Sequence, residues 1–259
     1  MMNQPNVNGD WMHPSAGVEV APISRSAWKL DDEENVRYFT GLANQFGRDP
    51  RALDWGSRES QQLRFSVLAA VGDLGGASIL DVGCGQGDFL AWLIEQGIAC
   101  QYTGIDITPS MIDHCRQRFG VEGFEGDASN ESPLHGSTES HFKRWRVVPP
   151  QFLVGSMQGF PGEAPHRYDY VVSSGIFAHR HHEPRAFLLE SAAAMFARCV
   201  KAVALNTLST WAERRDEGEF HADPADVLTS LRQLTPRVTL RHDYHPRDLT
   251  VYLYRAAAQ

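Results

Sequence analysis

The sequence has few cysteines, and their spacing argues against both disulfides and a zinc or redox motif. Its 259 residues include only Cys84, Cys100, Cys115 and Cys199, and no two of them are separated by two residues. Isolated cysteines in a chain of this size are typical of reduced, buried side chains. We therefore expect a cytoplasmic protein and not a disulfide-linked secreted one.

Long apolar runs are also missing. No stretch approaches the roughly 20 apolar residues that cross a bilayer. Residues 1 to about 17 lack the basic start and apolar centre of a secretory signal. The sequence therefore predicts a soluble protein with no membrane partner.

Positive charge is scarce as well. The chain has 24 Lys and Arg against 32 Asp and Glu, a net charge of −8. A protein that binds nucleic acid usually has a broad electropositive surface, which this balance disfavours. The basic run KRWR over 143–146 is the one exception, and it is more typical of a solvated turn than of an RNA contact. We expect a small-molecule substrate, and both a monomer and a homodimer remain open.

Regular structure is predicted from residue 30 onward. Residues 1–25 are rich in Asn, Pro, Ser and Gly and are expected to form a flexible tail. Apolar periodicity predicts helices over 30–46 and 60–71, within an N-terminal helical unit over 26–75. The acids at 31–34 suit a helix N-terminus. Strands are then expected at 78–82, 102–105, 152–154, 168–172, 200–205, 238–241 and 250–254, and helices at 89–95, 109–119, 184–198 and 224–234.

The alternation of strands and helices predicts an α/β fold, in which a doubly wound sheet has helices on both faces. The last two strands are joined by only a few residues. A connection this short cannot form a parallel crossover, so this pair should be antiparallel. Residues 121–150 have weak periodicity and are much longer than a simple connection needs. We interpret them as an insertion that folds near the active site.

Two elements point to a ligand. The run DVGCGQG over 81–87 follows a strand and begins a helix, and its glycines allow a tight turn that a ligand can approach closely. About 20 residues later, Asp106 ends the next strand. A carboxylate at this point can accept hydrogen bonds from both hydroxyls of a ribose.

Together these elements resemble motifs I and II of the class I S-adenosylmethionine-dependent methyltransferases. The resemblance extends from about Trp28 to Arg255. It implies a Rossmann-like seven-stranded sheet whose last strand is antiparallel, a catalytic domain over 76–259 and a lid formed by the N-terminal helices. S-Adenosylmethionine is the implied cofactor. A nucleotide-binding Rossmann enzyme of another kind is the alternative.

The resemblance also implies cofactor contacts. The following residues match them by position: Asp81, Gly83, Cys84, Gly85, Gly87, Asp106, Ile107, Met111, Ser174 and Gly175. For the adenine, the distance to the fourth strand favours Ser156 and Met157, while Asp127 fits chemically and remains a second choice. Arg58 is a candidate for the methionine carboxylate, because a guanidinium pairs with a carboxylate through two hydrogen bonds. An ordinary surface arginine is the competing interpretation.

Histidines follow the fourth predicted strand. His179, His181 and His182 are candidate general bases, because imidazole titrates near neutrality. A solvated polar loop explains them equally well, and adjacent histidines give poor metal geometry, so no metal is expected. Candidates for substrate contact are Tyr38, Trp55, Ile176, Phe177 and Asn206.

The resemblance implies transfer of a methyl group from S-adenosylmethionine to an O, N or C atom of a small molecule. One rival is an enzyme of the same fold that cyclises or cleaves the aminobutyryl part of the cofactor and releases methylthioadenosine. Nothing in the sequence separates it from methyl transfer. The other rival is a non-catalytic protein that binds S-adenosylmethionine, and the intact glycines and Asp106 argue against it.

Overall fold

The computed structural model describes residues 25–121, 148–162, 167–179 and 181–256, with side chains from residue 31 onward. The predicted tail, nearly all of the predicted insertion, the basic run over 143–146 and Asp127 lie outside the described residues. The helices are α1 (Arg25–Phe46), the 3-10 helix η1 (Pro50–Leu53), α2 (Arg58–Ala69), α3 (Asp88–Glu95), α4 (Pro109–Phe119), α6 (Pro184–Arg198) and α7 (Pro224–Leu231). The strands are β1 (Ser78–Val82), β2 (Gln101–Asp106), β3 (Gln151–Val154), β4 (Tyr168–Ser173), β5 (Cys199–Ser209), β6 (His221–Ala222), β7 (Val238–Arg241) and β8 (Asp248–Tyr254).

The sheet has the order β3-β2-β1-β4-β5-β8-β7, and the two-residue β6 pairs with β5. Strands β3, β2, β1, β4 and β5 are parallel, whereas β8 is antiparallel to both β5 and β7. The predicted mixed sheet with an antiparallel end is therefore confirmed. Strand β6 was not predicted, because its two residues are too few to show an apolar period.

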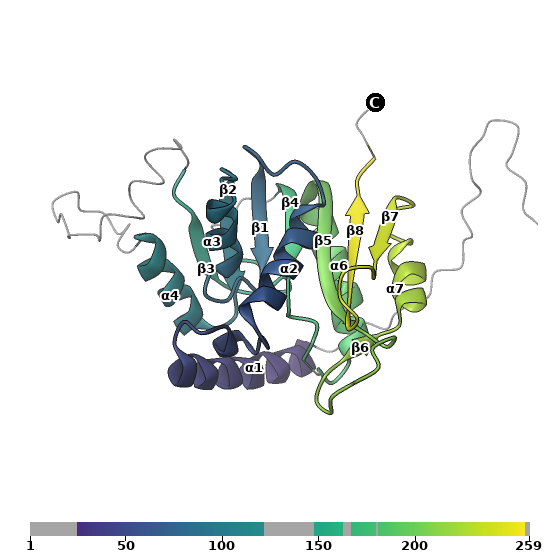
Figure 1. Cartoon of the computed structure of the whole chain (residues 1–259), viewed down its shortest axis with the longest axis horizontal. Helices are drawn as coiled ribbons and strands as arrows, with labels where there is room; N and C mark the ends of the chain where they lie inside the picture. Colours follow the sequence, from purple (N-terminus) through teal and green to yellow (C-terminus); the bar gives the residue numbers. More distant parts are fainter. Residues whose placement is uncertain (1–24, 122–147, 163–166, 180, 257–259) are drawn as a thin grey trace, which may run out of the picture.

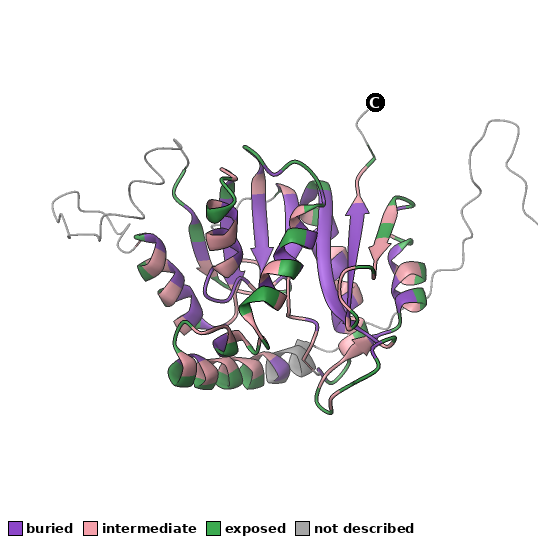
Figure 2. Ribbon diagram, in the orientation of Figure 1, coloured by how far each residue is buried: buried purple, intermediate pink, exposed green. Residues whose placement is uncertain are grey.

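Each face of the sheet packs against its own helices. Side chains alternate between faces along a strand, so Ile79 of β1 joins one core and its neighbour Leu80 joins the other. The Ile79 core includes Phe65 of α2 and Ile112 of α4, and the Leu80 core includes Leu188 of α6. Figure 2 shows the buried strands in the middle of this sandwich. The carboxyl ends of the parallel strands are thereby held together at one edge.

Helix α1 lies across that edge of the sheet, below β1 and its parallel neighbours in Figure 1. It begins at Arg25, more than a turn before the predicted start at Leu30. The acids at 31–34 therefore lie inside the helix and not in its first turn, which corrects the sequence interpretation of them. Asp31 is buried and Asp32 half-buried, whereas Glu33 and Glu34 are exposed.

Helix α2 begins at Arg58, two residues before the predicted start. The hydroxyl oxygen of Ser57 accepts a hydrogen bond from the backbone N–H of Ser60, which satisfies an otherwise unpaired donor of the first turn. The short η1 precedes it and ends at Asp54, which has a left-handed backbone with φ of 59°. Asp54 is the one non-glycine residue with positive φ among those the structure describes.

Candidate active site

The glycine-rich turn after β1 adopts a conformation that only glycine adopts without strain. Gly83, Gly85 and Gly87 have φ values of 73°, 52° and 75°. A Cβ on Gly83 would overlap Cγ2 of Ile176, and one on Gly85 would lie 2.8 Å from a methyl carbon of Leu53. The backbone N–H groups of Gly83 and Cys84 both donate to the carbonyl oxygen of Ile105, at 2.8 and 3.0 Å. The turn is thus fixed against the end of β2.

Asp106 connects this turn to the next one. Its Oδ2 accepts a hydrogen bond from the backbone N–H of Gly85 at 2.9 Å, and its Oδ1 accepts one from the backbone N–H of Thr108 at 2.8 Å. Burial raises the pKa of Asp106, and hydrogen bonds from the backbone N–H groups of Thr108 and Gly85 and from the Thr108 side chain oppose this shift. An ionised carboxylate has about four acceptor sites, so Asp106 can still accept a hydrogen bond from a ligand.

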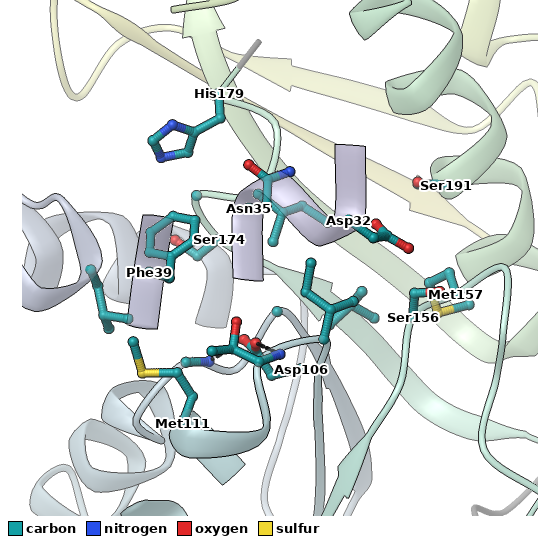
Figure 3. Close-up of a pocket in the computed structure, with 18 of the residues that line it drawn as sticks. Asp32, Asn35, Phe39, Asp106, Met111, Ser156, Met157, Ser174, His179 and Ser191 are labelled. Carbon is teal, nitrogen blue, oxygen red and sulfur yellow. Dashed lines mark hydrogen bonds between the residues drawn. The ribbon is translucent and has the colours of Figure 1, made fainter. Parts of the chain in front are cut away.

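A cavity, here called the central cavity, lies between this edge of the sheet and α1. Its walls come from Asp32, Asn35 and Phe39 of α1 and from the turns that follow β1, β2, β3 and β4. Figure 3 shows Asp106 and Met111 on one side, with α1 across from them. The cavity therefore combines the carboxyl ends of four neighbouring strands, where doubly wound sheets bind ligands.

One end of the central cavity is apolar. Ile107 and Met157 line it together with Ser156, whose hydroxyl oxygen accepts a hydrogen bond from the backbone N–H of Gly159 at 3.1 Å. The side chain of Met157 is almost fully buried, and Met111 lines the cavity on the other side of Asp106 in Figure 3. This end offers a flat ring two apolar walls.

The turn after β4 is held by Asn206 of β5. The side-chain oxygen of Asn206 accepts a hydrogen bond from the backbone N–H of Gly175 at 3.1 Å, and its amide donates to the hydroxyl of Ser174 at 3.1 Å. Ser174, Gly175 and Ile176 all line the central cavity. The buried Asn206 therefore holds this turn in place through two hydrogen bonds. It also lines a second cavity.

The second cavity, here called the polar cavity, shares Leu53, Trp55, Gly175 and His179 with the central one. Its other walls contain ion pairs. A guanidinium nitrogen of Arg64 lies 2.6 Å from Oδ2 of Asp248, and Nδ1 of His245 lies 2.8 Å from the same oxygen. Arg247 pairs with Glu219 at 2.5 Å. The ring of Trp55 lies under the Arg64 guanidinium, 4.8 Å away. None of these charged residues was predicted from the sequence.

His179 lies where the two cavities meet. Its ring contacts those of Tyr38 and Phe39 with centroid distances of 5.3 and 5.0 Å, and its Nε2 lies 3.8 Å from Oδ2 of Asp54. Burial lowers the pKa of His179, while the carboxylates of Asp54 and Glu219 act in the opposite direction. The imidazole is therefore mostly neutral near pH 7 and can accept a proton.

The other two histidines differ from each other. His181 is buried, lines the central cavity and stacks on Phe187 at a centroid distance of 3.8 Å, and burial lowers its pKa. His182 has an exposed side chain whose Nδ1 lies 2.5 Å from Oδ1 of Asp31, and this contact raises its pKa. Of the three candidate bases, His179 and His181 therefore line the central cavity and His182 does not.

Comparison with known proteins agrees with this architecture. Residues 80–200 match a family model described as a methyltransferase domain. A putative methyltransferase of Mycobacterium tuberculosis is 27% identical over 191 residues, which cover 70% of this chain and 94% of that protein. The crystal structure of magnesium protoporphyrin IX methyltransferase from Synechocystis with bound S-adenosylmethionine has the same fold, with a TM-score of 0.56 at 18% identity over 87% of this chain and 97% of that one. Residues 80–200 therefore form a methyltransferase domain, and the chain has the fold of an S-adenosylmethionine-dependent methyltransferase.

Another relative matches over a shorter region. A fatty-acid O-methyltransferase of Mycolicibacterium smegmatis is 38% identical over 77 residues, and the match spans 29% of this chain and 28% of that enzyme. In the parts of the methyltransferase that the structure describes, no helix is long and apolar enough to span a membrane. Within the same parts, no three His, Cys, Asp or Glu residues are grouped as metal ligands.

Several residues that the sequence assigned to the site lie outside both cavities of the methyltransferase. Arg58 is exposed, with a guanidinium nitrogen 3.4 Å from Oε1 of Glu95, so this arrangement does not support its predicted contact with the methionine carboxylate. The position of Arg58 at the start of α2 directs it toward α3, and helical periodicity alone could not reveal this. Phe177 is buried in the core against Phe187 and is not a wall of either cavity. Tyr38 is exposed and donates its hydroxyl to Asp54 at 3.3 Å.

Three members of the glycine-rich motif support the turn without lining a cavity. Asp81 is buried and accepts a hydrogen bond from the hydroxyl of Tyr102 at 2.5 Å, and burial raises its pKa to about 7. Cys84 is a buried neighbour of Gly104. Gly87 is the residue before α3 and lies against Phe119. The sequence motif thus identified the turn correctly, but only Gly83 and Gly85 of its predicted contacts line the central cavity.

Proposed function

We propose that S-adenosylmethionine binds in the central cavity, with its adenine between Ile107 and Met157 and its ribose hydroxyls on Asp106. The methionine part then follows Gly83 and Gly85 toward Ser174. The chemistry of the cavity supports this fit, because the Asp106 carboxylate can still accept a hydrogen bond from a ribose hydroxyl and the turn after β1 leaves no room for a Cβ. The N-terminal unit over 26–75 covers the cofactor, since Asn35 and Phe39 of α1 form the opposite wall.

The observation that carries the proposal is the junction of the two cavities at Gly175 and His179. A cofactor that lies along Gly83 directs its methyl group toward this junction. A small molecule in the polar cavity can then present an O, N or C atom in line with the breaking bond, at about 3–3.5 Å from the methyl carbon. A reaction of the cofactor with itself needs no second cavity, so the polar cavity favours methyl transfer.

His179 is the proposed general base. It removes the proton of the attacking hydroxyl or amine, and the nearby carboxylate of Asp54 stabilises the imidazolium that forms. The side chains of Trp55 and Asn206 contact the acceptor from the polar cavity. The acceptor is a small polar molecule, because the buried pair of Arg64 and Asp248 and the half-buried pair of Arg247 and Glu219 favour hydrogen-bonding groups opposite them.

The binding part of the proposal is tested by calorimetry with S-adenosylhomocysteine. Asp106→Asn should weaken binding by about 10-fold or more, because the ribose hydroxyls lose a charged acceptor. The matched control is Asp113→Asn, an exposed acid on α4 that lines no cavity described here. Wild-type affinity in the Asp106 variant would remove the ribose assignment.

A further inference from the structure

Asp32 occupies an unusual position for an acidic residue of an N-terminal helix. It lines the central cavity together with Ser156 and Met157, and it also lines an adjoining groove with Val154 and Gly155 at the end of β3. Figure 3 shows its carboxylate on the side of Ser156 and Met157, away from His179. Asp32 therefore faces the apolar end of the central cavity.

The carboxylate of Asp32 has no hydrogen bond or ion pair with any residue in the described part of the chain. It is half-buried, and burial together with the neighbouring Asp31 raises its pKa to about 6. Removing a carboxylate from water without supplying a donor is unfavourable. A ligand that brings N–H groups to this point would offset that cost.

Adenine brings such groups. Its 6-amino group has two N–H donors, and the apolar walls of Ile107 and Met157 provide no acceptor for them. The hydroxyl oxygen of Ser156 accepts a hydrogen bond from Gly159 and is uncharged, so it is a weaker acceptor than a carboxylate. Among the described residues at this end of the cavity, Asp32 is the carboxylate that remains available.

We propose that Asp32 accepts a hydrogen bond from the 6-amino group of the cofactor's adenine and so selects an adenine base. This inference rests on the proposed function, which places the adenine between Ile107 and Met157. Recognition of the base then comes from α1, the helix that covers the cavity, and not from a residue on the turn after β3. Binding of the cofactor and the position of α1 are coupled as a result.

Asp31, the residue before Asp32, contacts a different part of the site. Asp31 points toward the turn after β4, where its carboxylate contacts the backbone N–H of His182 at 3.3 Å and Nδ1 of the same residue at 2.5 Å. Two successive residues of α1 therefore face different parts of the site. Asp31 thereby holds α1 against the segment that contains His182. Asp32, the next residue, is left facing the adenine.

The test compares S-adenosylhomocysteine with S-inosylhomocysteine, in which a carbonyl oxygen replaces the 6-amino group. Wild-type protein should bind the adenosyl compound about 10-fold or more tightly, because the inosyl oxygen faces the carboxylate of Asp32 without a donor. In Asp32→Asn the side-chain amide can donate to that oxygen, so the preference should fall to about threefold or less. Glu34→Gln on the exposed face of α1 is the control and should keep the full preference.

Each outcome distinguishes the two proposals. If Asp32→Asn keeps the wild-type preference while Asp106→Asn weakens binding, the role of Asp32 is refuted and the proposed function stands. If wild-type protein does not bind S-adenosylhomocysteine, both are refuted. Equal weakening of both compounds in Asp32→Asn would also contradict base selection, because a general structural role predicts that result. Circular dichroism of each variant checks that it is folded.

Discussion

The central cavity and the polar cavity meet at His179 but are built in different ways. The central cavity is formed mainly by backbone turns at the ends of four parallel strands, and its geometry depends on glycines and on Asp106. The polar cavity is formed by side chains from α2, β5, β8 and the segment around Glu219, and ion pairs hold these together.

This difference predicts which amino-acid substitutions should damage each cavity. A turn that only glycine can adopt should fail when a Cβ is added, whatever the chemistry of the substitution. A wall of paired charges should fail when one partner is removed, because the other is then left buried without compensation. Substitutions that add a Cβ or remove one charge should therefore affect the two cavities differently.

The largest effect is expected for the buried ion pair of the polar cavity. Arg64→Met should lower the free energy of unfolding by about 3–5 kcal/mol, because it leaves the nearly inaccessible carboxylate of Asp248 without its guanidinium partner. Arg185→Met is the matched control, since Arg185 forms a comparably short pair with Asp226 on the surface. That control should cost less than about 1 kcal/mol in urea unfolding. Equal losses would mean that the polar cavity does not depend on its ion pair.

The glycine-rich turn gives the next largest effect. Alanine at either Gly83 or Gly76 forces a side chain into left-handed backbone, at a cost of about 1–2 kcal/mol. Only at Gly83 does the new Cβ also overlap Ile176, whereas nothing lies within 4 Å of it at Gly76. Gly83→Ala should therefore weaken binding of S-adenosylhomocysteine by about 10-fold or more, since an overlap of this kind displaces the turn. Gly76→Ala should bind it normally, and a loss shared by both variants would assign the effect to backbone strain alone.

The smallest effect concerns His179, where the cavities meet. Its pKa should lie below 6.5, because burial disfavours the imidazolium. The Asp54 carboxylate stabilises that charge, so Asp54→Asn should lower the pKa further. Two charges 4 Å apart interact by about 1 kcal/mol in water and by more at a partly buried site, so the change should be measurable. The measurement is an NMR titration, with the His179 signal assigned by its loss in His179→Gln.

The control for this titration is Asp49→Asn, an acid of the same segment that pairs with Arg51. It should leave the pKa of His179 unchanged. An unchanged value in Asp54→Asn would show that this carboxylate does not act on the histidine.

Most of the central cavity could be predicted from the sequence, because its parts are local. The turn over 83–87 follows its strand directly, and Asp106 ends the next strand, so the parallel sheet brings them together. The apolar periods likewise gave the bounds of α4, α6 and β7 as the structure has them. Asp32 was interpreted as a helix N-terminal acid, since the start of α1 lies in a stretch without a clear apolar period.

The polar cavity could not be predicted in this way. Arg64 and Asp248 are 184 positions apart, and neither belongs to a motif. Trp55 and Asn206 were singled out because they are polar or aromatic residues near expected strand or helix ends, and both line this cavity. Their partners follow only from the packing of α2 against β5 and β8, which depends on the whole sheet.

The nucleoside product shows whether methyl transfer takes place at the junction of the two cavities. The protein is incubated with S-adenosylmethionine, first alone and then with a panel of small alcohols, carboxylic acids and amines, and the products are separated by chromatography. Methyl transfer should yield S-adenosylhomocysteine in an amount equal to that of the methylated acceptor, and none when no acceptor is supplied. Rapid formation of methylthioadenosine from S-adenosylmethionine alone would contradict it.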